Sequence, residues 1–189
     1  LGELVPLRDI RVLGEPILRQ EPIPVSEFSD ELQRLIDDMF VTMRAAKGIG
    51  LAAPQVGRRE RLTVVDVDGK AFVLINPEII TRQGSAKAEE GCLSIPDVYA
   101  DVERATRVVV RALDRTGKPF EVEGTDLLAR CMLHEIDHLF GTLFIDHLSV
   151  LKRRNALAKW AKEKDKYPQL SRRLDAADLA DHQHLDEEL

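Results

Sequence analysis

One predicted helix, between Thr125 and Gly141, constrains the fold of this chain more than any other segment. Threonine is a common residue at the start of a helix, and glycine is common just after its end. Apolar side chains fall on nearly every side of this helix: Leu127, Leu128, Met132, Leu133, Ile136, Leu139 and Phe140. A helix that is apolar all round is a buried one, so we expect the rest of the 189-residue chain to fold around it.

The same helix carries two histidines, His134 and His138, with Glu135 between them. Positions i and i+4 lie on one face of a helix, one turn apart, so both imidazoles can bind one metal ion. The pattern H-E-x-x-H is typical of zinc hydrolases in which the glutamate acts as a general base. A catalytic site of this type usually takes three protein ligands and a water, so a third ligand must come from elsewhere.

The residues alone leave the third ligand open. The extended metalloprotease motif H-E-x-x-H-x-x-G-x-x-H fits at Gly141 but fails at Phe144, which cannot bind a metal. Glu163 is a candidate only by its distance along the chain. A cysteine thiolate is a stronger ligand, and Cys92 and Cys131 are both candidates. A cysteine on a core face is more often an apolar filler, and spacing does not choose between the two.

The rest of the pattern predicts an α+β fold. A helix should follow Ser29 and stop before Gly48, and short β-branched runs between residues 62 and 124 should form antiparallel sheet. A third helix is predicted from Ser149 to about Lys166. We therefore expect antiparallel β-sheets wrapped around a buried central metal-binding helix, with N- and C-terminal flanking helices. Residues 1–168 should form one catalytic domain, and the acidic segment 169–189 a mobile tail or an interaction tail.

Composition narrows the class of protein. With 44% hydrophobic and 32% charged residues, the chain fits a soluble globular protein. Its net charge of -6 argues against broad nucleic-acid binding. No apolar run approaches the ~20 residues that cross a bilayer, and the first residues lack the pattern of a secretory signal. Two cysteines form no disulfide framework, which favours a reduced, intracellular protein.

Three separated motifs together resemble the peptide deformylase family. They are GIGLAAPQ (residues 48–55), EGCLS (residues 90–94) and HEIDH (residues 134–138), in the family's order and with similar separations. The similarity extends over about residues 8–160. The resemblance implies that Cys92, His134 and His138 are the metal ligands, and it assigns Cys131 to the wall of the substrate pocket.

The implied reaction removes the formyl group from the N-terminal formyl-methionine of nascent polypeptides and releases formate. Glu135 would accept a proton from a metal-activated water and deliver it to the departing amine. The side-chain amide of Gln55 and the backbone N–H of Leu93 would stabilise the oxyanion together with the metal.

The resemblance also implies where the peptide binds. An extended substrate would pair as an added strand at Ile49 and Gly50, and Ile49, Leu127 and Cys131 would line an apolar pocket for the methionine side chain. Glu90 and Arg104 would pair beneath the cysteine loop, although two solvated charges are an equal alternative. Some family members have an arginine where this chain has Tyr99, so their arginine's contact to the substrate must be made otherwise here.

The resemblance further implies one divalent metal ion, with Fe(II) expected and zinc, nickel or cobalt as replacements. It suggests that the basic helix 149–166 docks on the ribosome, which the acidic tail would oppose. A bacterial cytoplasmic location follows, with an organelle as the alternative, and no membrane partner is expected. Two other functions stay open: a peptidase of the H-E-x-x-H type, and a non-catalytic ribosome-associated factor, against which the intact Glu135 and Gln55 argue.

Overall fold

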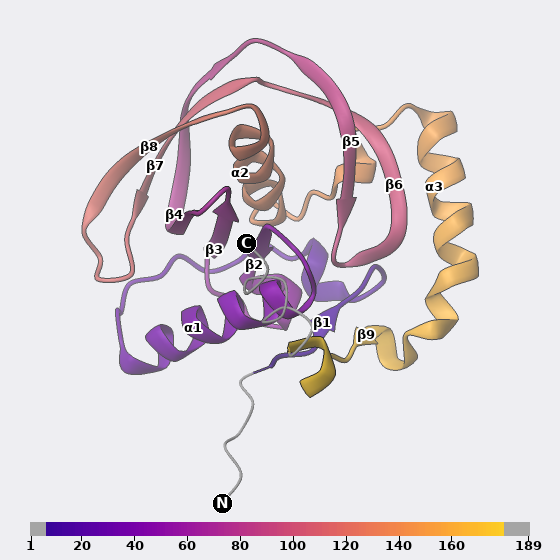
Figure 1. Ribbon diagram of the computed structural model, residues 1–189, viewed down its shortest axis with the longest axis horizontal. Helices are drawn as coiled ribbons and strands as arrows, with labels where there is room; N and C mark the ends of the chain where they lie inside the picture. Colours follow the sequence, from indigo (N-terminus) through magenta and orange to yellow (C-terminus); the bar gives the residue numbers. More distant parts are fainter. Residues whose placement is uncertain (1–6, 180–189) are drawn as a thin grey trace, which may run out of the picture.

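Helix α2 (Asp126–His138) lies in the middle of the fold, beneath the curved strands of the sheets (Figure 1). The computed structural model describes residues 7–179, and no helix within that range is long and apolar enough to cross a membrane. Leu128, Met132 and Ile136 of α2 share one buried core with apolar residues of the strands. The predicted buried helix is therefore confirmed, and it carries both histidines into the interior.

The helix differs from the prediction in its length and in two of its apolar neighbours. It ends at His138, and Gly141 beyond it has a φ of 68°, in the left-handed region that favours glycine. Leu127 is 47% exposed and Phe140 is 58% exposed, so not every apolar side chain is buried. Phe140 follows the helix end, where the guanidinium of Arg61 lies over its ring.

The strands are antiparallel, as the pattern of residues 62–124 predicts. A five-stranded sheet has the order β2 (Gly50–Ala52), β3 (Leu62–Val67), β4 (Lys70–Gln83), β7 (Arg107–Leu113) and β8 (Pro119–Thr125). A separate hairpin consists of β5 (Ala86–Cys92) and β6 (Ile95–Arg104). Among the described residues β2 pairs with β3 alone, so one edge of β2 is open.

Two further helices flank this centre, also as predicted. α1 (Asp30–Ala45) begins where Ser29 Oγ accepts a hydrogen bond from the backbone N–H of Leu32, and it packs in a second core with β2 and β3. α3 (Val150–Glu163) packs against β6 on the outside of the hairpin (Figure 1). The α+β architecture with a central helix is thus confirmed.

The described chain also contains several short elements. They are β1 (Ile10–Arg11), β9 (Ser171–Arg172) and 3-10 helices at Pro16–Arg19, Ala53–Val56, Phe144–His147, Lys164–Lys166 and Pro168–Leu170. β9 pairs antiparallel with β1, so the chain beyond α3 returns to the N-terminal strand. The predicted boundary between the domain (1–168) and the tail (169–189) stays a prediction. Within the tail, Ser171 and Arg172 form β9, and residues 180–189 lie outside the described range.

Candidate metal centre

Cys92, His134 and His138 come together, although the cysteine is far from the histidines in the sequence. Cys92 ends β5, and the histidines lie one turn apart on α2. One potential ligand atom from each of the three lies within 4.8 Å of the other two. Cys92 Sγ is 3.5 Å from His138 Nε2. A tetrahedral ion with bonds of about 2.0 Å to nitrogen and about 2.3 Å to sulfur would separate such a pair by about 3.5 Å.

The other sulfur and the acidic candidate lie elsewhere. Cys131 Sγ contacts the backbone oxygen of Ile49 at 3.4 Å, and burial raises the pKa of this thiol. Glu163 is on α3, where it forms an ion pair of 2.6 Å with Lys166. The three-dimensional arrangement therefore favours Cys92, the cysteine that the family resemblance implies and that spacing alone did not single out.

The donor set and its buried atoms fit a divalent cation. Two imidazoles and one thiolate suit iron, zinc, nickel or cobalt. Glu135 Oε2 is buried and has no hydrogen-bond partner among the described residues, although buried polar atoms are normally bonded. Burial lowers the pKa of His138, which favours the neutral imidazole that a metal requires. A hydrated cation beside these groups would supply the missing partner of the Glu135 carboxylate.

Glu90 orients one of the two histidines. His134 Nδ1 donates a hydrogen bond of 2.8 Å to Glu90 Oε1, so its Nε2 is left to face the cluster. Arg104 binds both oxygens of Glu90, at 2.8 and 3.0 Å, and Arg130 adds a third contact at 2.7 Å. Burial alone would raise the pKa of Glu90, but the bonds from His134 and Arg104 outweigh it and lower the pKa to about 2. The carboxylate is therefore charged and fixed behind the histidine.

The same network reaches the protein surface. Arg104 also pairs with Asp137 at 2.6 Å, and His147 Nε2 lies 2.7 Å from the same Asp137 oxygen. The sequence offered no spacing that would place His147 here, because it belongs to a separate 3-10 helix. Asp137 therefore acts on the site through Arg104.

We predict that Arg104→Met weakens both the fold and the metal centre. The change removes the two-point partner of a buried carboxylate, which typically destabilises a protein by about 3–5 kcal/mol. It also releases the group that orients His134, so metal affinity should fall about 10- to 100-fold. Urea unfolding and metal titration of the metal-free protein measure the two effects. Arg111→Met, which breaks the exposed pair with Glu121, is the matched control and should change neither; equal losses in both variants would contradict the prediction.

Gly50 lets strand β2 approach the glutamate of the H-E-x-x-H motif. A Cβ atom added at residue 50 would lie 2.6 Å from Glu135 Oε1 and 2.7 Å from its Cγ. Any other residue here would therefore push Glu135 out of place. Burial raises the pKa of Glu135 to about 7, and a nearby cation would lower it again by favouring the charged form. The carboxylate is thus suited to accept and release a proton near neutral pH.

We predict that Gly50→Ala lowers turnover about 100-fold, because a shift of about 1 Å in a catalytic group can cost that much. Formate release measured at saturating substrate tests this, with metal content determined on the same samples. Gly69→Asn is the control, because a Cβ there meets open space and asparagine tolerates its φ of 76°. A normal rate in Gly50→Ala would show that the contact with Glu135 does not matter.

Gln55 is fixed with its amide nitrogen toward the cluster. Its Oε1 accepts a hydrogen bond of 2.8 Å from the backbone N–H of Ala52. Its Nε2 donates to Ser94 Oγ at 3.1 Å and lies 3.7 Å from Cys92 Sγ. Leu93 sits between Cys92 and Ser94 in the turn of the β5–β6 hairpin. It lines the pocket into which the cluster opens. Both groups predicted to hold the oxyanion therefore lie beside the cluster.

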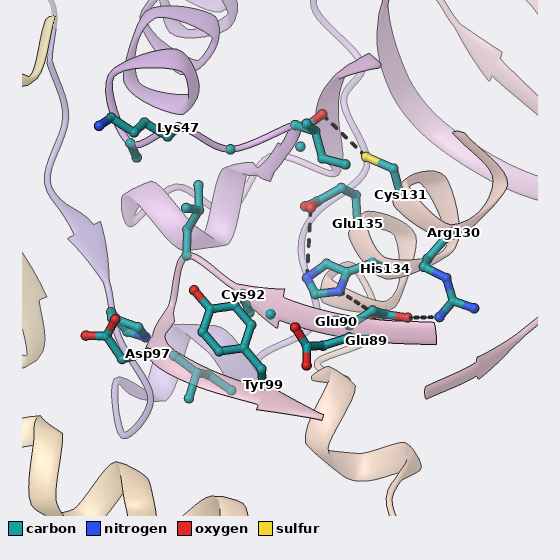
Figure 2. A pocket seen from close by; sticks show the side chains of 18 of the residues that line it. Lys47, Glu89, Glu90, Cys92, Asp97, Tyr99, Arg130, Cys131, His134 and Glu135 are labelled. Atoms are coloured by element: carbon teal, nitrogen blue, oxygen red, sulfur yellow. Dashed lines mark hydrogen bonds and ion pairs between the residues drawn. The ribbon is translucent and has the colours of Figure 1, made fainter. Parts of the chain in front are cut away.

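The cluster opens into a pocket of about 470 Å³. Every residue predicted to bind substrate lines it: Ile49, Gly50, Leu127 and Cys131. Ile49 is 42% exposed, and it and Leu127 present apolar surface to this space. Figure 2 shows Glu135, His134 and Cys131 on the α2 side of the pocket, facing Tyr99 and Asp97 across it. The sequence motifs thus build one cavity from β2, β5 and α2.

Comparison with known proteins agrees with this arrangement. Residues 7–154 match the family model described as polypeptide deformylase. The peptide deformylase of Hydrogenovibrio crunogenus is 53% identical over 158 residues, which cover 82% of this chain and 94% of that protein. The crystal structure of a peptide deformylase from Legionella pneumophila superposes with a TM-score of 0.81 at 51% identity, covering 84% of this chain and 96% of that one.

A second solved structure extends the similarity. The peptide deformylase from Synechococcus elongatus, crystallised in complex with actinonin, has a TM-score of 0.78 and 41% identity, covering 85% of this chain and 95% of that one. The matches include all three motifs of the pocket, since the family model spans them. The chain therefore belongs to the polypeptide deformylase family.

Proposed function

We propose that Cys92, His134 and His138 hold the metal ion with which this protein performs its family's reaction. The protein is a metal-dependent hydrolase that removes the formyl group from the N-terminal formyl-methionine of nascent polypeptides and releases formate. The observation that carries the assignment of residues is the convergence of the three ligand atoms within 4.8 Å, beside the buried Glu135.

The peptide would bind as an added strand on the open edge of β2. The Ile49 carbonyl already accepts a hydrogen bond of 2.8 Å from the Asp66 N–H, so the peptide would pair with other backbone groups of Ile49 and Gly50 on the open edge. Main-chain pairing of this type holds peptides without regard to their sequence. The methionine side chain would fill the apolar space between Ile49, Leu127 and Cys131. This placement brings the formyl group to the end of the pocket where Glu135 lies.

Glu135 would carry the proton through the reaction. A divalent cation held by Cys92, His134 and His138 would supply Lewis-acid chemistry: it would make a water easier to deprotonate and would polarise the formyl carbonyl. Glu135 takes the proton from the attacking water and delivers it to the amine nitrogen as the C–N bond breaks. The Gln55 amide and the Leu93 N–H donate hydrogen bonds to the oxygen that gains charge, and removing one such donor typically costs about 2.7–4 kcal/mol of barrier.

We expect Fe(II) to be the native ion, with zinc, nickel or cobalt able to replace it. Thiolate and imidazole ligands suit all four ions. A partly exposed thiolate beside iron is open to oxidation, so the iron form should lose activity in air. Metal analysis of protein purified without oxygen tests the identity of the ion.

The decisive experiment measures formate released from formyl-Met-Ala-Ser by the metal-loaded protein. Release of formate with the rest of the peptide intact supports the proposal. Cleavage of an unformylated peptide, with none of the formylated one, would favour an H-E-x-x-H peptidase instead. Absence of both reactions in metal-loaded protein would favour a non-catalytic ribosome-associated factor.

We propose further that α3 docks on the ribosome. Residues 151–166 contain seven basic side chains and two acidic ones, and Lys152, Arg154, Lys159 and Lys162 on α3 are all exposed. Such a surface suits the phosphates of ribosomal RNA. Co-sedimentation with ribosomes at rising salt concentration tests this. Arg154→Glu combined with Lys159→Glu should abolish binding while formate release from a short peptide continues, and unchanged binding would contradict the proposal.

The place of action would be the bacterial cytoplasm, where formylated nascent chains arise. The relatives from Hydrogenovibrio crunogenus and Alkalilimnicola ehrlichii are bacterial proteins. An organellar location is the alternative, and fractionation of the source cells would distinguish the two.

A further inference from the structure

The wall of the pocket includes residues of the C-terminal segment, and the part lined by Asp97, Tyr99, Tyr167 and Arg172 is called its mouth below. Beyond Glu135 and Leu127, its wall includes Asp97 and Tyr99 of β6, and then Tyr167 and Arg172. The last two follow α3 and lie beyond residue 154, where the match to the family model ends. Residues far from all three sequence motifs therefore line the same pocket as the motif residues.

Several contacts fix this segment in place. The Tyr167 ring stacks on the buried Trp160, with ring centroids 5.9 Å apart. The backbone oxygen of Leu170 accepts a hydrogen bond of 3.0 Å from the N–H of Val12. Arg172 then pairs with Ile10 in the β1–β9 ladder, and Ile10 is fully buried. Arg172 consequently starts from an anchored backbone, which reduces the entropy lost when it binds a ligand.

The Arg172 guanidinium differs in its partners from Arg130, the other arginine that lines the pocket. Arg130 lines the same pocket but is engaged with Glu90 and with the backbone oxygen of Val102, each at 2.7 Å. Among residues 7–179, no acidic group forms an ion pair with Arg172. Lys47 lines the same pocket as a further basic residue. A cation at a pocket wall attracts an anionic group of the ligand.

Two acidic side chains that line the pocket oppose the positive charge of Arg172. Asp97 lines the same space and acts on Tyr167 with a sign opposite to that of Arg172. Glu89 is an exposed acid on the wall nearer α2. The attraction from Arg172 is therefore local and depends on which peptide residue passes it.

We propose that Arg172 selects peptides by the charge of the residues that follow the formyl-methionine, favouring an acidic side chain over a basic one. This inference rests on the deformylase activity proposed above. With the formyl group at Glu135 and the methionine in its apolar space, the downstream residues leave through the mouth that Arg172 borders. The selection acts on binding of the peptide, so it should appear in KM more than in kcat.

The test compares formyl-Met-Ala-Asp, formyl-Met-Ala-Asn and formyl-Met-Ala-Lys, each with an amidated C-terminus. For the unchanged protein we expect kcat/KM to fall in that order, by about fivefold from Asp to Lys, as for a partly exposed ion pair. Arg172→Gln should abolish the difference and Arg172→Glu should reverse it. Because the readout is a ratio within each variant, partial loss of folded protein cancels.

Two further variants sharpen the result. Arg173→Gln removes the same charge one residue further on, from a side chain that is 79% exposed, and should keep the full preference. Asp97→Asn should enlarge the preference. Equal rates on the three peptides, or an unchanged preference in Arg172→Gln, would overturn the role of Arg172. No formate from any peptide would instead remove the deformylase assignment itself.

Discussion

Glu135→Ala should lower formate release by about 100- to 10,000-fold, the usual loss when a general acid–base group is removed, while the protein keeps its metal ion. Glu135 lies in the H-E-x-x-H motif, but its nearer carboxylate oxygen is still 4.0 Å from His134 Nε2. Its other oxygen is buried and has no partner among the described residues. The residue is thus placed to handle a proton, and the ligand set is complete without it.

The measurement pairs single-turnover formate release with metal analysis of the same sample. Glu89→Ala is a matched control, since Glu89 lines the same pocket but is exposed and is not one of the three residues of the cluster. Its turnover should stay close to that of the unchanged protein. A nearly normal rate in Glu135→Ala would exclude this glutamate as the proton carrier, and loss of the metal would show that it acts as a ligand.

Cys92→Ser should lose both metal and activity, whereas Cys131→Ser should keep most of both. The Cys92 sulfur lies 3.5 Å from His138 Nε2, and a serine hydroxyl is a much weaker ligand than a thiolate. The Cys131 sulfur contacts a backbone oxygen, which a serine hydroxyl can also do. The two variants make the same chemical change at two positions that the sequence could not distinguish by spacing.

Metal content and formate release, measured side by side, decide the assignment. Reloading each variant with excess zinc or nickel under reducing conditions separates weak binding from misfolding. Retention of stoichiometric metal by Cys92→Ser, or its loss from Cys131→Ser, would contradict the proposed ligand set.

Local patterns were sufficient for much of the fold. The apolar surface of residues 126–138 predicted a buried helix, since only an interior can accept a helix without a polar face. Ser29 and Ser149 marked the starts of two helices, because their hydroxyls bond the backbone N–H groups that a helix leaves unpaired. The end of α2 was predicted less well than its start. The helix was expected to run up to Gly141, but it ends at His138.

Some features of the candidate site could also be predicted from the sequence, and others could not. The i, i+4 spacing of His134 and His138 follows from helix geometry, and the pairing of Glu90 with Arg104 was considered from sequence. That Glu90 also bonds His134, and that Arg104 links Asp137 and His147 to it, could not be predicted. These contacts join β5, β6 and α2 with the 3-10 helix that carries His147, and no local periodicity encodes such distances.

The sequence by itself determined the chemistry that the chain can perform: two imidazoles on one helical face, a glutamate between them and glycines where a backbone must come close. Spacing along the chain did not say which sulfur lies beside the histidines; the motif resemblance named Cys92, and the position of the β5–β6 hairpin relative to α2 brings its Sγ within 3.5 Å of His138 Nε2. Only the tertiary structure decided that Arg172 borders the pocket, because strand pairing between β1 and β9 brings together residues from the two ends of the chain. The sequence gives the identity of each side chain directly. Which side chains come together at one site depends on the long-range packing of the whole core.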